Sequence, residues 1–297
     1  MEVIITGANG FIGSSLVDYF YSKGHRVFGI VKDKKQDVSS IEDKCTIVYC
    51  ELDNLESIKE LFLEPNERIL YHLAWQGVNG PGKADFKIQL HNIEMCCDCA
   101  NFAKSIGCKK ILFAGTIAER SVDSLGNIVK TSSGMMYGVA KLSARRFVET
   151  LCKNIGLKFV WMQFSNIYGP KNKTGNLISY TLNQLFNNQE AEYGPADQPY
   201  DFVFVDDLIK AAYLLGTSVT TKDFYFVGSG TPRILKDYLF KVGDLMGKPN
   251  LIVVGKRPDD GVKYDFSMLE TAILEHDIGP YVSMSFEEAI KYTIENY

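Results

Sequence analysis

The chain has 297 residues, of which 46% are hydrophobic and 23% charged, and its formal net charge is −4 at pH 7. This composition excludes a disordered chain and is typical of a globular protein with one large core or two adjoining ones. The interspersed charges exclude a general nucleic-acid or membrane-surface binder, and no apolar run approaches the roughly 20 residues of a membrane span. Because the chain opens on a strand and not on a charged leader, we expect a cytoplasmic protein.

The first predicted strand, residues 3–5, runs directly into a glycine-rich loop and an amphipathic helix over residues 14–21. The spacing of Gly7, Gly10 and Gly13 suits a tight turn, a close approach of pyrophosphate to the backbone, and packing of helix on strand. The N-terminus of the helix then faces the phosphates with free N–H groups and the positive end of its dipole. The loop residues assigned to a dinucleotide are Gly7, Asn9, Gly10, Phe11, Ile12 and Gly13.

Further short apolar runs alternate with helical stretches along the first half of the chain, at residues 27–31, 46–50, 69–74, 111–114 and 159–164. This alternation predicts a Rossmann-type, doubly wound parallel sheet with helices on both faces. We assign residues 1–166 to this domain and expect residues 200–228, which begin with a strand at 202–205, to rejoin its sheet. Residues 167–199 and 229–297 are assigned to a smaller, interleaved lobe that binds the substrate.

Seven cysteines include the cluster Cys96, Cys97 and Cys99. The cluster lies in a predicted helix over residues 88–105, where adjacent side chains diverge around the axis and cannot hold one ion together. We therefore expect reduced thiols and no metal site.

Two residues at helical spacing, Tyr137 and Lys141, begin a predicted helix that runs to about residue 153. Positions i and i+4 share a helix face, so the ammonium is expected to lower the pKa of the phenol towards the range of a general acid or base. Upstream, the strand at 111–114 ends in Gly115-Thr116, which puts Thr116 at the carboxyl edge of the sheet, where ligands bind. Thr116, Tyr137 and Lys141 together provide the hydroxyl, phenol and ammonium groups that a carbonyl or alcohol redox site needs.

Motifs in a fixed order then connect the chain with a known family. They are Thr6-Gly-Ala-Asn-Gly-Phe-Ile-Gly13, His72-Leu73-Ala74, Asn92-Ile93, Tyr137-x-x-x-Lys141, Asn166-Ile167-Tyr168-Gly169-Pro170, Asp201-Phe-Val-Phe-Val-Asp-Asp207 and Arg257-Pro258. Over nearly its whole length the chain resembles the extended short-chain dehydrogenase/reductases, specifically the nucleotide-sugar epimerases, dehydratases and reductases. The resemblance implies a Rossmann domain for NAD(P), a smaller lobe for a nucleotide diphosphate-sugar, and a homodimer formed through the helices at 88–105 and 136–153.

The resemblance also implies roles for individual residues. Tyr137 would be the catalytic acid or base, Lys141 would bridge the ribose and the phenol, and Thr116 would hold the sugar oxygen. The other cofactor contacts assigned are Lys32, Glu51, Leu52, Leu73, Ala74 and Asn92. Besides Thr116, the residues assigned to the substrate are Trp75, Asn166, Leu177 and Arg257, of which Asn166 and Arg257 would address the diphosphate. Trp75 replaces a small residue of the family, and it could equally pack in the core.

The end of the second predicted strand favours NADP, with NAD as the alternative. An acidic residue there would accept the ribose hydroxyls and repel a 2′-phosphate, but the chain has Val31 followed by Lys32. A shift of the alignment by two residues would bring Asp33 to this position and restore the acid.

The residues after Thr116 argue against one of the family's reactions. Sugar 4,6-dehydratases have Asp-Glu there, and this chain has Ile117-Ala118, which disfavours elimination unless Glu119 reaches into the site. What remains is reduction of a nucleotide-linked 4-keto sugar by NADPH or 4-epimerisation with bound NAD. The lysines near the expected ribose position make reduction the preferred function and 4-epimerisation the alternative. A non-catalytic NADP(H) sensor remains a third hypothesis, although it would not need Thr116, Tyr137 and Lys141.

Overall fold

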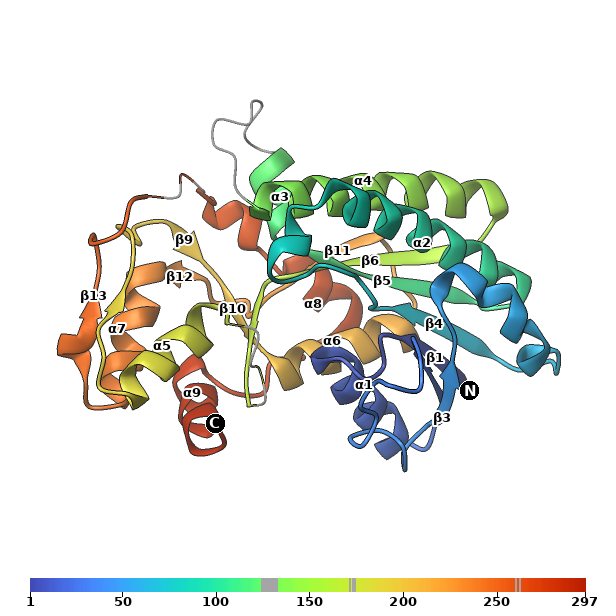
Figure 1. The fold of residues 1–297 in the computed structure, drawn as a ribbon, viewed down its shortest axis with the longest axis horizontal. Coiled ribbons are helices and arrows are strands. Elements are labelled where there is room, and N and C mark those ends of the chain that lie inside the picture. The colour runs from blue at the N-terminus through green and yellow to red at the C-terminus, as the bar shows by residue number, and fades with distance from the viewer. Residues whose placement is uncertain (124–132, 171, 173–174, 260, 262) are drawn as a thin grey trace.

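The computed structural model describes residues 1–123, 133–170, 172, 175–259, 261 and 263–297. Within these residues, the larger lobe is built on a seven-stranded parallel sheet with the order β11-β6-β5-β4-β1-β2-β3 (Figure 1). Its strands are β1 (Glu2–Thr6), β2 (Arg26–Val31), β3 (Thr46–Tyr49), β4 (Arg68–His72), β5 (Lys110–Thr116), β6 (Lys158–Phe164) and β11 (Phe224–Val227). The strand order reverses between β1 and β4, the point at which open α/β sheets bind ligands. The predicted Rossmann-type fold is confirmed.

Helices cover both faces of this sheet (Figure 1). One face carries α2 (Phe86–Ser105) and α4 (Ser133–Ile155), and the other carries α1 (Phe11–Ser22) and α6 (Val205–Thr217). The strands are apolar along nearly their whole length because side chains on both sides are removed from water. Short elements at the edges of the sheet are η1 (Leu52–Phe62), η2 (Pro81–Lys83) and α3 (Ala118–Asp123).

The smaller lobe holds three two-stranded sheets, within the described residues, and the helices around them. The strand pairs are β7 (Asn166–Tyr168) with β10 (Phe202–Phe204), β9 (Pro199–Tyr200) with β12 (Arg233–Ile234), and β8 (Ala191–Glu192) with β13 (Ile252–Val253). The helices and single turns are α5 (Leu177–Phe186), α7 (Leu235–Leu245), η3 (Pro249–Leu251), η4 (Phe266–Leu269), α8 (Ala272–Ile278) and α9 (Phe286–Glu295). Of these, α8 packs back against β11 and α6 of the larger lobe.

One strand expectation is wrong. The segment at 202–205 does not rejoin the central sheet, because β10 pairs in parallel with β7. Within the expected residues 200–228, the segment that does return is β11, which pairs with β6 at the edge of the sheet. Both strands are short and apolar, so their patterns do not distinguish the two partners.

The cysteines of the predicted helix lie on α2 as free thiols. Burial raises the pKa of Cys96 to about 12, so its thiol stays protonated at neutral pH. In the described part of the chain, no group of three His, Cys, Asp or Glu side chains is arranged to hold a metal ion. None of the described helices is both long enough and apolar enough to cross a membrane.

Candidate active site

The glycine-rich loop joins β1 to α1 and leaves room that larger residues would fill. Gly7 has a φ of +68°, and a Cβ there would lie 2.9 Å from the backbone nitrogen of Ala74. A Cβ on Gly13 would lie only 2.1 Å from the carbonyl oxygen of Gly7, so α1 can approach the loop this closely only with glycine at that position. Phe11 and Ile12 open α1, in the first turn, whose N–H groups have no acceptor within the helix.

A cavity of about 370 Å³ lies beside this loop, at the carboxyl ends of the strands. Eight residues assigned to the cofactor line it, namely Gly7, Asn9, Gly10, Lys32, Glu51, Leu52, Leu73 and Ala74, and Trp75, assigned to the substrate, lines it as well. Ile30, Gln36, Cys50, Asp53, Gln76, Val78 and Met95 complete the lining. These seven were missed because they come from separate strands, loops and helices, among them Met95 of α2 and Asp53 of η1, which only the fold brings together. A glycine cradle at a helix N-terminus fits a dinucleotide diphosphate.

The two residues that follow β2, Lys32 and Asp33, have different surroundings. Lys32 is exposed and lines the cavity. Asp33, the acid that a shifted alignment would use, accepts a hydrogen bond from the backbone nitrogen of Lys35 at 2.8 Å. That contact places the carboxylate in a local turn.

Thr116, Tyr137 and Lys141 come together between β5 and α4. A hydrogen bond links the side chains of Thr116 and Tyr137. The Lys141 ammonium is buried and donates to the carbonyl oxygen of Ala114 at 2.7 Å. It lies 5.9 Å from the centre of the Tyr137 ring, so the i and i+4 positions share a face as expected.

The expected effect of Lys141 on the phenol is wrong in this structure. The pKa of Tyr137 is raised above its ordinary value, first by burial and then by the negative charge of Glu119, and the Thr116 hydrogen bond opposes both only in part. Burial also lowers the pKa of Lys141 to about 8. Tyr137 is therefore a protonated phenol at neutral pH.

Trp75 stands beside both of these side chains. Its ring lies 3.7 Å below the Lys141 ammonium and edge-on to Tyr137, with 6.0 Å between the ring centres. The indole nitrogen donates to Gln89 at 3.0 Å, which fixes the ring orientation. The ammonium of Lys83, on η2, lies 5.2 Å from the centre of the Tyr137 ring. Trp75 therefore lies between the cavity and Tyr137, and its partly buried ring also packs against the core on this side of the sheet.

The side chains of Asn92 and His72 make their hydrogen bonds to other residues of the protein. The Asn92 amide accepts from the backbone nitrogen of Gln76 at 2.8 Å and donates to its carbonyl oxygen at 2.9 Å, so Asn92 fixes the loop after β4 and does not line the cavity. His72 is buried beside Thr6 and Cys99, and burial lowers its pKa to about 3. A neutral imidazole in this position packs within the core.

The assigned substrate residues of the smaller lobe lie in two groups. Asn166 accepts a hydrogen bond from the Tyr200 hydroxyl at 3.0 Å. Arg257 donates to the Tyr180 hydroxyl at 2.8 Å, and its side chain is 53% exposed. Leu177 begins α5, the helix that carries Tyr180. The guanidinium is thus accessible to an anion from solvent.

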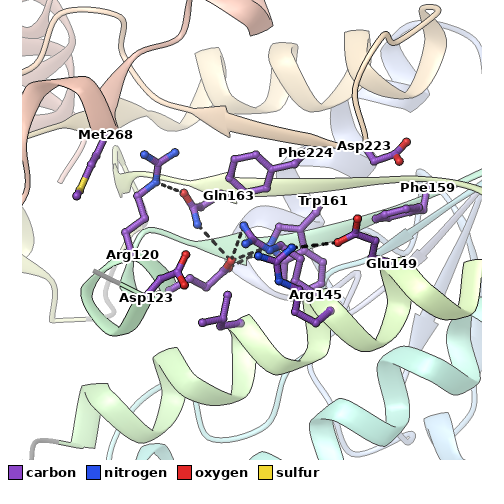
Figure 2. Close-up of a pocket in the computed structure, with 13 residues that line it drawn as sticks. Arg120, Asp123, Arg145, Glu149, Phe159, Trp161, Gln163, Asp223, Phe224 and Met268 are labelled. Carbon is purple, nitrogen blue, oxygen red and sulfur yellow. Dashed lines mark hydrogen bonds and ion pairs between the residues drawn. The ribbon is translucent and has the colours of Figure 1, made fainter. Parts of the chain in front are cut away.

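A second cavity, of about 580 Å³, lies on the α4 side of β6 and β11 (Figure 2). Figure 2 shows Arg145, Trp161 and Gln163 converging there, with Arg120 beside Gln163. Glu119 also lines this cavity, and its carboxylate is bonded to Trp161 and Gln163. It does not line the cavity beside the glycine-rich loop.

Comparison with known proteins identifies clear relatives. A family model described as the NAD-dependent epimerase/dehydratase family matches residues 3–228. The CDP-abequose synthase of Yersinia pseudotuberculosis is 25% identical over 73% of this chain and 74% of its own length. The dTDP-6-deoxy-L-talose 4-dehydrogenase (NAD(+)) of Aggregatibacter actinomycetemcomitans is 28% identical over 70% and 77%. The structure of a UDP-glucose 4-epimerase from Thermotoga maritima with UDP-glucose superimposes with a TM-score of 0.79, at 22% identity over 100% and 98% of the two chains.

Proposed function

Because the chain belongs to the NAD-dependent epimerase/dehydratase family, we propose that it reduces the C4 keto group of a nucleotide-linked sugar with NADPH. The observation that carries this proposal is the meeting of Thr116, Tyr137 and Lys141 beside a glycine-lined cavity at the carboxyl edge of the sheet. A protein that only senses the dinucleotide has no need for this set.

The three side chains divide the work of the reduction. Bound NADPH supplies a hydride to the C4 carbon. Tyr137 gives its phenolic proton to the C4 oxygen, which balances the charge that the hydride brings. Thr116, hydrogen-bonded to Tyr137, positions that oxygen. Lys141, held by Ala114 and Trp75, lies on the same helix face as Tyr137 and orients the cofactor ribose.

Two observations favour reduction over the family's other reactions. Elimination needs an acid and a base next to Thr116, but this chain has Ile117 and Ala118, and the Glu119 carboxylate is occupied by Trp161 and Gln163. A protonated phenol is the form that a ketone reductase needs, whereas oxidation of a sugar alcohol begins with the phenolate.

The alternative is an NAD-dependent 4-epimerase, in which the same residues would serve both half-reactions. Mass spectrometry of the purified protein for retained dinucleotide separates the two functions. We expect little retained NAD, together with consumption of added NADPH, followed by its absorbance, when a nucleotide-linked 4-keto sugar is supplied. Stoichiometric retained NAD without consumption of NADPH would instead support the epimerase.

Lys32 supports NADPH as the cofactor, because this cationic residue lines the cavity just after β2. The Lys32→Ala variant is expected to raise the Kd of NADPH about fivefold to tenfold relative to that of NADH, the loss of a partly exposed contact worth roughly 1–1.4 kcal/mol. Fluorescence titration with both dinucleotides measures this ratio. Lys34→Ala is the matched control, since Lys34 is exposed and does not line the cavity. An unchanged ratio in Lys32→Ala would assign the preference to other residues.

We also propose a homodimer formed through α2 and α4. Large apolar side chains are exposed on these helices, among them Leu90 at 60% and Phe147 at 61%. Burying such residues against a second copy of the same helix pair would remove them from water.

A further inference from the structure

Glu119 is a buried carboxylate directly behind the proposed catalytic residues. Its side chain is 1% exposed, and it accepts a hydrogen bond from the backbone nitrogen of Thr116 at 2.7 Å. The indole nitrogen of Trp161 donates to its two oxygens at 3.0 and 3.1 Å, and Gln163 donates at 3.2 Å. The carboxylate therefore ties the end of β5 to β6.

The end of β5 is shaped to admit these contacts. A Cβ on Gly115 would lie 2.2 Å from the indole nitrogen of Trp161 and 2.8 Å from a carboxylate oxygen of Glu119. The backbone that carries Thr116 can approach the carboxylate only because Gly115 has no side chain. Since Thr116 is hydrogen-bonded to Tyr137, the chain of contacts leads from Glu119 to the phenol.

The charge of Glu119 is compensated only in part. Arg145 is the nearest cation, at 3.8 Å, and its buried Nε has no hydrogen-bond partner among the described residues. The hydrogen bonds to the carboxylate come from neutral donors, the backbone nitrogen of Thr116 and the side chains of Trp161 and Gln163. Burial raises the pKa of the Glu119 carboxyl, and the hydrogen bonds from Thr116 and Trp161 and the charges of Arg145 and Lys141 oppose this rise. When ionised, the buried carboxylate acts on neighbouring titratable groups.

We propose that Glu119 is a positioning residue that holds Thr116 in place for Tyr137, and that its negative charge adds to burial in keeping the Tyr137 phenol protonated. The donor role rests on the proposed reduction, whereas the effect on the phenol does not. A negative charge disfavours the phenolate, so Tyr137 keeps its proton until hydride arrives on the substrate and creates a stronger base.

Other charged or titratable groups face Tyr137 or Lys141 from the surrounding elements. Lys83 on η2 and Lys141 on α4 are the cations near the ring. Around Lys141 are the neutral His72 of β4 and the thiol Cys96 of α2. On α3, Arg120 is bonded to Gln163 and lies next to Glu119 in the sequence. Burial raises the pKa of Tyr137 most, and the carboxylate of Glu119 is the negative charge that raises it further.

A purely structural role for Glu119 predicts a different outcome. Thr116-x-x-Glu119 has the pattern of a helix capping box, in which the glutamate accepts from a backbone nitrogen at the start of α3. Loss of a cap lowers stability by about 1 kcal/mol but leaves the titration of Tyr137 unchanged.

The test is the titration of Tyr137 in Glu119→Gln, which removes the charge and keeps an oxygen that can accept from Thr116. NMR of protein labelled at the tyrosine ζ-carbon follows the phenol, and Tyr137→Phe identifies its signal. Below the titration midpoint we expect an ionised fraction about tenfold larger in Glu119→Gln than in the wild type at the same pH. Glu149→Gln is the matched control, since Glu149 lines the same cavity and pairs with Lys153 and Arg146. An unchanged titration in Glu119→Gln, or an equal change in Glu149→Gln, would overturn the proposal.

A second variant separates position from charge. Glu119→Asp keeps the charge, but its shorter side chain withdraws from Thr116, so we expect an unchanged Tyr137 titration with kcat for reduction lowered about tenfold and KM little changed. If Glu119→Gln does not fold, an altered titration in Glu119→Asp would contradict the proposal by itself. The titration needs no substrate. Failure of the wild type to reduce any keto sugar would therefore overturn the proposed function and leave the effect on the phenol standing.

Discussion

Replacing Tyr137 with phenylalanine is expected to lower kcat for keto-sugar reduction by about 10²–10⁴-fold and to leave cofactor binding nearly intact. The change removes one hydroxyl and keeps the ring. The edge-on contact with Trp75 and the position under Lys83 use only that ring, so both survive. The variant loses the hydrogen bond to Thr116 and the proton that is transferred to the substrate. Steady-state kinetics and dinucleotide titration measure the two effects separately.

Tyr71→Phe is the matched control for this prediction. Tyr71 is buried on β4, and its hydroxyl donates to the carbonyl oxygen of Ala212 of α6 at 2.9 Å, on the face of the sheet opposite to α4 (Figure 1). Removal of this hydroxyl is expected to lower the free energy of unfolding by roughly 0.5–1.5 kcal/mol. Turnover should be unchanged at a temperature where the variant is folded. Comparable turnover in Tyr137→Phe and Tyr71→Phe would rule out Tyr137 as the proton donor.

Gly13→Ala is expected to have the second large effect, on cofactor binding. The added methyl group would meet the carbonyl oxygen of Gly7 at 2.1 Å, so α1 and the loop must separate. Such overpacking costs about 1–3 kcal/mol of stability, and it displaces the backbone N–H groups that face the cofactor phosphates. We expect dinucleotide binding to fall below detection in isothermal titration while circular dichroism still reports a folded protein.

Gly24→Ala provides the comparison for the glycine variant. Gly24 has a φ of +75°, and no atom lies within 4 Å of a Cβ built there. Alanine at position 24 is therefore expected to lower the free energy of unfolding only by the strain of the left-handed backbone, about 1 kcal/mol. Dinucleotide binding should be unchanged. If Gly13→Ala bound the dinucleotide as tightly as Gly24→Ala does, the glycine-rich loop would not be the phosphate site.

The fold could be predicted largely from local pattern. Strands covered on both faces are continuously apolar, which made β1, β2, β4, β5 and β6 visible in the sequence. The partner of a three-residue strand such as β10 carries no such signal, because pairing with β7 depends on how the two lobes meet. The apolar pattern identified the element but not its sheet.

In the site, too, some features could be predicted from local sequence and others depend on the fold. Spacing within one element is a local property, so Gly7, Gly13, Tyr137 and Lys141 could be identified without the structure. The pKa of Tyr137 could not, because it depends on burial and on Glu119, whose approach requires the fold. The amide of Asn92 is likewise occupied by Gln76, which only the folded loop brings near.

The central claim is tested most directly by following a label from the cofactor to the sugar. The purified protein is incubated with NADPH deuterated at the transferable C4 position and with a nucleotide-linked 4-keto sugar, and the product is examined by mass spectrometry and NMR. The account predicts one deuterium, bound to C4 of the sugar, in the wild type and almost none in Tyr137→Phe over the same time. Product without deuterium at C4, or no product from the wild type with either NADPH or NADH, would contradict it.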